Sequence, residues 1–184
     1  MAPFDGSRIV AMINWLALIE NSGFSTWVRE SGSLWSYPGL VFLHTVGLAL
    51  LVGPSLALDL RLFGVAGELP VAPFERFFPI MWAGFWMNVA SGLVLLASEA
   101  TTKLVNPTFY VKMACIAVAV VVMVKLRGLL REPGLDARPL PPRARTLAWI
   151  STLAWLGAIT AGRLMAYLGP GSVNAPPQFT RLGG

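Results

Sequence analysis

Cysteine, histidine and charge are the scarcest features of this 184-residue sequence. Cys115 is the only cysteine and His44 the only histidine, so the chain cannot form an intrachain disulfide or a structural zinc site from cysteines and histidines. Charged residues make up 12% of the chain and hydrophobic residues 55%, whereas soluble domains are about one quarter charged. With a mean hydropathy of +0.66, this composition excludes an ordinary soluble domain and indicates an integral membrane protein.

Recognisable catalytic motifs are also missing. The sequence contains no G-x-S-x-G nucleophile motif, no H-E-x-x-H zinc motif and no phosphate-binding glycine loop. Its apolar segments hold no paired carboxylates that could share acid and base roles. We therefore assign no enzymatic activity from the sequence.

Four apolar stretches are near the length of about twenty residues that a membrane-spanning helix requires. They cover residues 39–58, 77–98, 108–130 and 147–168. Backbone polar groups need partners inside lipid, so each stretch should be helical. The sequence thus predicts an all-α fold, an antiparallel four-helix bundle over residues 36–168. Pro54 inside the first span predicts a kink, with Ser55 or a neighbouring helix supporting the freed carbonyl.

The segments on either side of the bundle have different compositions. Residues 1–35 carry apolar side chains at helical spacing beside polar ones, and the apolar stretch among them is too short to cross a bilayer. They predict an amphipathic helix that lies in the membrane interface. Residues 169–184 are rich in glycine and proline and predict an irregular tail.

Basic residues gather between the third and fourth spans. Six lysines and arginines lie from Lys125 to Arg145, and such loops stay in the cytoplasm. Both termini are then expected on the opposite, outer side. This topology accounts for the net charge of +5, so we predict no nucleic-acid partner. The expected partners are membrane lipids and either another membrane protein or further copies of the chain.

Small residues at four-residue spacing predict the faces on which helices approach each other in lipid. The first and fourth spans each carry such a stripe, and the second carries a more polar one in which Asn88 is expected to bond to another helix. The three stripes are Thr45, Ala49, Gly53 and Ala57; Gly84, Asn88 and Ser91; and Ala154, Ala158 and Gly162.

Ionisable residues inside the spans are the candidates for function. At a rise of about 1.5 Å per residue, His44, Lys112 and Arg163 should share one layer just below the outer surface, together with Met113 and Met165. A plainer role is open to each of them. The histidine can serve as a hydrogen-bonding partner between helices, and the two cations can extend to the lipid headgroups.

Near the opposite end of the first span, Asp59 and Arg61 form a charged pair in the sequence. We expect them to be structural, pairing locally or contacting Glu75 and Arg76.

Three kinds of ligand suit the layer around His44. A b-type haem would take His44 as its axial metal ligand, Gly47 to admit the macrocycle, and Lys112 or Arg163 to pair with its propionates. Copper would use soft ligands, and the candidates are His44, Met113, Met165 and Cys115. A quinone or an anionic headgroup would accept hydrogen bonds from the same cations. The alternative to a cofactor, with its electron-transfer or anchoring role, is a non-catalytic accessory subunit of a larger membrane complex.

Several short motifs resemble a bacterial family of small four-helix membrane proteins of unassigned function. The specific ones are His-Thr-Val-Gly at residues 44–47 and Asp-Leu-Arg-Leu at residues 59–62, and further matches bring the resemblance to residues 27–112. Gly92, Phe109 and Lys112 are more distantly similar to the copper-resistance D and four-helix protoporphyrinogen-oxidase-like membrane proteins. The more distant resemblance implies copper handling or haem chemistry. Taken with the charge distribution, the resemblance to a bacterial family predicts a bacterial inner membrane with both termini in the periplasm. The single histidine departs from the multi-histidine sites of those relatives.

Overall fold

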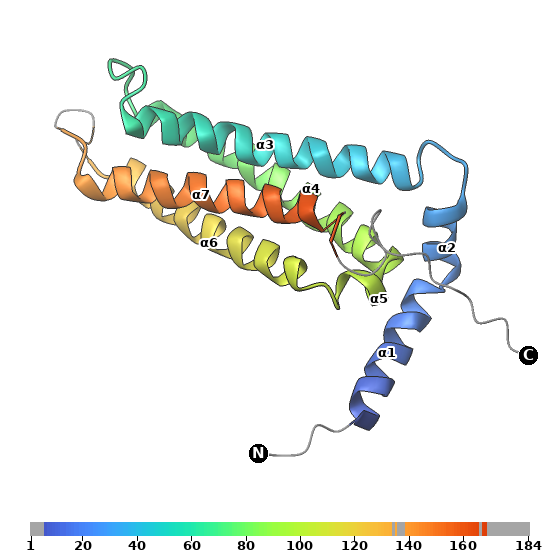
Figure 1. The fold of residues 1–184 in the computed structure, drawn as a ribbon. Helices are drawn as coiled ribbons and strands as arrows, with labels where there is room; N and C mark the ends of the chain where they lie inside the picture. Colours follow the sequence, from blue (N-terminus) through green and yellow to red (C-terminus); the bar gives the residue numbers. More distant parts are fainter. Residues whose placement is uncertain (1–5, 134, 136–138, 166, 169–184) are drawn as a thin grey trace, which may run out of the picture.

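The computed structural model describes residues 6–133, 135, 139–165 and 167–168, and this part of the chain is helical without any strand (Figure 1). Four of its helical segments are long and apolar enough to cross a membrane. The predicted all-α bundle is therefore confirmed. The predicted tail at 169–184 lies outside the described residues. The elements are α1 (Gly6–Glu20), α2 (Gly23–Glu30), α3 (Tyr37–Phe63), η1 (Ala72–Phe77), α4 (Phe78–Ser98), α5 (Ala100–Lys103), α6 (Pro107–Leu130) and α7 (Pro142–Leu164).

Proline, asparagine and glycine set several of the helix boundaries. Pro107 and Pro142 each occupy the first helical position, where a missing N–H costs nothing. The Asn106 side chain accepts a hydrogen bond from the Thr108 amide at 3.0 Å and caps α6. At the end of α3, Gly64 takes the left-handed conformation with a φ of 102°. These signals place the start of α7 five residues earlier than expected and extend α3 to residue 63.

The four long helices pack in the order α4, α3, α7, α6 (Figure 1). The α3 helix lies against both α4 and α7, and α6 lies against α7. Helix α4 makes little contact with α6, whereas η1, which precedes α4, does touch α6. We call the end of the bundle where α3 and α6 begin the His44 end, and the opposite end the Asp59 end. The first and last helices of this order, α4 and α6, are thus joined only at the Asp59 end, where η1 touches α6.

The apolar core is concentrated towards the Asp59 end. Its largest fully buried side chains there include Phe78, Met81, Met123, Leu126 and Trp155. The first two turns of α6 contain no fully buried residue, although Ala119 and the residues that follow it on one face are buried. The half of the bundle that holds His44 is consequently the more loosely packed one.

Helices α3 and α4 approach each other most closely at two glycines. A Cβ on Gly84 would lie 2.7 Å from the Gly47 carbonyl oxygen and 2.8 Å from the Leu51 amide nitrogen. Backbone atoms cannot move aside as a flexible side chain can, so this crossing needs glycine. Gly84 and Ser91 are buried as the stripe on the second span predicts, and so are Ala154 and Ala158 of the fourth.

The small-residue stripe predicted on the first span is not a packing face of this bundle. Thr45, Ala49, Gly53 and Ala57 are all exposed. The buried face of α3 runs instead through Gly47, Leu51, Val52, Ser55, Leu58, Asp59 and Leu62. The contact with Gly84 turns this face inward and leaves the small-residue stripe on the outside.

The segment before the bundle forms two helices rather than the single one expected, with a break at Asn21 and Ser22. The Ser22 side chain accepts from the Ser25 amide at 3.3 Å and caps α2. Arg29 then donates to the carbonyl oxygens of Glu20 at 3.2 Å and of Ser98 at 3.0 Å. These bonds tie α1 and α2 to the end of α4. Their location in a membrane interface stays a prediction.

The glycine crossing predicts a large difference between two conservative substitutions. Gly84→Ala should destabilise the protein by about 1–3 kcal/mol, because the new methyl group overlaps the α3 backbone. Gly53→Ala is the matched control, since nothing lies within 4 Å of its added Cβ. Unfolding in mixed micelles followed by circular dichroism measures both. Equal unfolding midpoints for the two variants would contradict the crossing.

Candidate functional site

His44 lies in the second turn of α3 and faces α4. Its Nδ1 is 3.0 Å from the Ser91 hydroxyl oxygen. The single hydroxyl proton of Ser91 points to the Met87 carbonyl oxygen at 2.7 Å, which is the usual back-bond of a serine inside a helix. Ser91 must therefore accept from the imidazole, and the proton of a neutral His44 resides on Nδ1.

Two further residues of α4 fix the position of His44. The Asn88 side-chain amide donates to the His44 carbonyl oxygen at 2.8 Å, which confirms the predicted bond from Asn88 to another helix. Gly92 leaves room for the ring, because a Cβ there would lie 3.2 Å from the His44 Cε1. Residues 88, 91 and 92 of α4 thus hold the histidine in position.

This arrangement leaves Nε2 of His44 as the nitrogen with a free lone pair. Histidines that bind metals use one ring nitrogen for the metal and donate the other N–H to a nearby acceptor, which sets the tautomer and the ring orientation. The Ser91 hydroxyl supplies that acceptor here. The geometry suits both a helix-to-helix hydrogen bond and a ligand on Nε2.

Lys112 reaches the same level of the bundle from α6. Lys112 occupies the second turn of α6, at the end of the bundle where His44 occupies the second turn of α3. The lysine stem lies against α7, where a Cβ on Gly162 would be 3.8 Å from Lys112 Cδ and Cε. The structure therefore brings His44, Lys112 and the end of α7 into one layer.

The other predicted members of this layer are less enclosed. Arg163 is exposed, and so is Met113, with 47% of its surface accessible. Met165 is half-buried just after the end of α7. Within the described residues, neither Arg163 nor the two methionines form a polar contact with His44. Their part in a site stays a prediction.

Gly47 has a different role from the one expected for it. A Cβ on Gly47 would lie 2.9 Å from the Asn88 side-chain nitrogen and 3.0 Å from the Gly84 carbonyl oxygen. The space beside this glycine is filled by α4 and cannot admit a macrocycle. Gly47 serves the crossing of the two helices.

Cys115 lies away from the face that His44 presents to α4. Its Sγ is 3.0 Å from the Cβ position of Gly157, so the thiol packs against α7. No group of three or more His, Cys, Asp or Glu side chains that could hold a metal occurs in the described part of the chain. The copper set proposed from the sequence gains no support from this placement.

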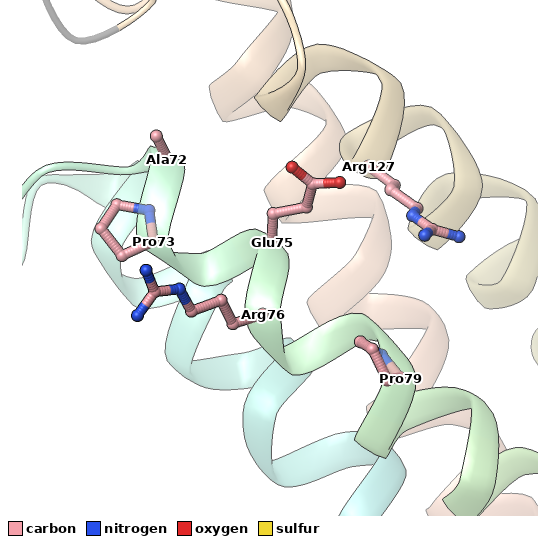
Figure 2. Close-up of a pocket in the computed structure, with 6 residues that line it drawn as sticks. All are labelled: Ala72, Pro73, Glu75, Arg76, Pro79 and Arg127. Atoms are coloured by element: carbon pink, nitrogen blue, oxygen red, sulfur yellow. The ribbon is translucent and has the colours of Figure 1, made fainter.

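A hollow of about 480 Å³ lies at the opposite end of the bundle, between η1, the start of α4 and α6 (Figure 2). Figure 2 shows the Glu75 side chain extending towards α6 and the Arg76 side chain extending towards Pro73. Glu75 pairs with Arg131 at 2.5 Å, and the Arg127 guanidinium lies 5.8 Å from the centre of the Phe78 ring. These contacts fasten η1 and α4 to α6.

The expected pairing of Asp59 with its charged neighbours is wrong. Arg61 donates instead to the carbonyl oxygens of Leu69 at 2.5 Å and Gly67 at 2.7 Å, which closes the loop after α3. Glu75 is engaged by Arg131. Asp59 is completely buried and accepts a bond from Thr152 of α7 at 3.1 Å.

Comparisons of the chain with models of known protein families, with curated proteins and with solved structures found no match. The class that the fold and the site define is a four-helix membrane protein with a single, anchored histidine.

The hydrogen bonds around His44 predict its tautomer. The imidazole nitrogens of ¹⁵N-histidine-labelled protein should show the Nδ1–H form at alkaline pH, and one histidine gives one unambiguous signal pair. Ser91→Ala removes the acceptor and should shift the population towards Nε2–H, while Ser98→Ala, two turns further along α4, should leave it unchanged. An Nε2–H imidazole in the unmodified protein would contradict the assignment.

Proposed function

We propose that this protein binds one b-type haem at the His44 end of the bundle, with Nε2 of His44 as the axial ligand. The observation that carries the proposal is the bond from Nδ1 to Ser91, which orients the ring and leaves Nε2 free. Bound haem would supply a one-electron redox couple whose potential depends on the ligand and its surroundings.

The neighbouring cations support the same proposal. Haem carries two propionates, and Lys112 is a half-buried ammonium group at the same end of the bundle as His44. Arg163, exposed one residue beyond Gly162, is the second candidate to pair with a propionate. A sixth ligand would come from Met113, Met165, a second copy's His44, or none.

Packing restricts where the macrocycle can lie. The space at Gly47 is filled by α4, whereas α4 and α6 make little contact with each other. His44 would therefore hold the haem through Nε2, and Lys112 of α6 is the cation that would pair with a propionate. On the charge distribution, we further propose that this end faces the periplasm of a bacterial inner membrane.

Optical spectroscopy tests the haem proposal. Protein purified in detergent after haem supply should show a Soret band, and His44→Ala should abolish it. Lys112→Met should weaken haem binding roughly tenfold, because one charge-assisted contact is lost. Lys125→Met removes an equal charge near the other end and should have no effect. No Soret band, or a band retained in His44→Ala, would refute the proposal; bound copper lost in His44→Ala would favour copper instead.

The second candidate function is an accessory subunit that packs against another membrane protein. The observation in its favour is the exposed stripe of Thr45, Ala49, Gly53 and Ala57 on α3. Small residues at this spacing allow a second helix backbone to come close. Since the bundle itself does not use this stripe, a partner helix is the simplest occupant.

The accessory proposal predicts that larger side chains on the stripe block association without unfolding the bundle. Ala49→Leu combined with Ala57→Leu should reduce the mass of complexes extracted in native nanodiscs to that of the single chain. Val121→Leu on the exposed face of α6 is the matched control. A single-chain mass for the unmodified protein would argue against this function.

A further inference from the structure

Five side chains form a polar cluster inside the α3–α7 interface, far from the His44 site along α3. Asp59 and Ser151 have no accessible surface, Trp155 has 1% and Ser55 has 2%, while Thr152 is half-buried at the edge. The cluster sits within two of the helices long and apolar enough to span a membrane. An ionisable side chain in such a place indicates a functional site.

The hydrogen bonds of this cluster are complete except at one atom. Trp155 Nε1 donates to the Ser55 hydroxyl at 3.0 Å, and the hydroxyls of Ser55 and Ser151 are 3.3 Å apart. Thr152 donates to Asp59 Oδ2 at 3.1 Å. Asp59 Oδ1 is buried and has no hydrogen-bond partner in the described part of the chain, although Ser151 lies beside the carboxyl group.

Among the residues that the structure describes, no basic side chain forms an ion pair with Asp59. The ion pairs formed by the described residues join Arg29 to Glu20, Lys103 to Glu99, Arg131 to Glu75 and Arg143 to Glu132. On α3, Arg61 is held by the carbonyl oxygens of the following loop. On α7, Arg145 lies in the wall of a hollow nearer the end of the bundle. A negative charge on Asp59 would thus be buried without compensation, which is costly in an apolar interior.

That hollow lies at the Asp59 end, close to the cluster but not lined by it. It measures about 510 Å³ and lies between the end of α3 and the start of α7. Two of the residues that line it are near the cluster in sequence. Leu62 is three residues from Asp59, and Trp149 is three residues from Thr152. Three residues of helix rise about 4.5 Å, so the hollow begins within one helical turn of the cluster.

We propose that Asp59 is a proton-binding site whose carboxyl group is protonated in the folded protein at pH 5.5, where an exposed aspartate is mostly ionised, with the hollow as its route to water. The proton resides on Oδ1, the oxygen without a partner, and Ser151 is placed to accept it, while Oδ2 accepts from Thr152. A proton suits the site better than a metal ion, because the cluster is fully packed and two of its contacts point N–H or O–H donors into it. On exchange, the proton leaves Oδ1 for water in the hollow, and Oδ1 regains a proton from the same water.

Isotope-edited infrared spectroscopy tests this assignment. The chain has three aspartates, Asp5, Asp59 and Asp136, so ¹³C-aspartate shifts few carboxyl bands. The folded protein at pH 5.5 should show the carbonyl stretch of a protonated aspartic acid, whereas an ordinary exposed aspartate is protonated in only about one molecule in forty at that pH. The band should disappear in Asp59→Asn and remain in Asp5→Asn and Asp136→Asn.

Two additional measurements distinguish a bound proton from a bound sodium ion and test whether water reaches the carboxyl group. Transfer into D₂O should shift the band, because the proton exchanges with water in the hollow. Sodium chloride should leave the band unchanged relative to choline chloride. An ionised Asp59 at pH 5.5, a band that does not shift in D₂O, or a band lost only in sodium would each overturn the proposal. If Asp59→Asn does not fold, retention of the band in both other variants still assigns it to Asp59.

Discussion

The close crossing of α3 and α4 at Gly47 and Gly84 is the constraint on which the rest of the structure depends. With no side chain on either residue, the two backbones approach until the Gly84 Cβ position lies 2.7 Å from the Gly47 carbonyl oxygen. That distance lets Asn88, one turn beyond Gly84, reach the His44 backbone and lets Ser91, two turns beyond Gly84, reach the His44 ring. A wider crossing would break these bonds, because hydrogen bonds require heavy-atom distances near 3 Å. The orientation of the histidine is thus a consequence of two missing side chains.

The two halves of the bundle differ in how tightly their helices pack. Towards the Asp59 end, the helices enclose large apolar side chains, and a polar cluster survives there only because serine, threonine and tryptophan supply hydrogen bonds. Towards the His44 end, α4 and α6 separate, and a histidine and a lysine occupy the looser interior. The tight half holds the helices in register, and the looser half carries the histidine and the lysine. A ligand at His44 and a proton at Asp59 would then use separate regions of one scaffold.

Hydropathy and turn residues were enough to predict the four spans, the bond of Asn88 and the packing stripes of the second and fourth spans, because length and small-residue spacing follow from lipid physics. The packing face predicted for α3 was wrong because this helix carries two sets of small residues, and spacing alone does not tell which set meets α4. Asp59 was misread as a partner of Arg61. Residues two apart lie on different sides of a helix, and that spacing, with Ser55 one turn before Asp59, was the signal for a buried polar face.

The most direct test of the account is the contact between the imidazole of His44 and the hydroxyl of Ser91. Solid-state NMR on membranes containing ¹⁵N-histidine and ¹³C-serine protein can detect it without ambiguity, since the chain has one histidine. The account predicts a strong dipolar coupling between Nδ1 and one serine Cβ, as the 3.0 Å hydrogen bond requires. An imidazole that couples only to lipid or water would contradict it, and the crossing of α3 on α4 could no longer explain how the site is held.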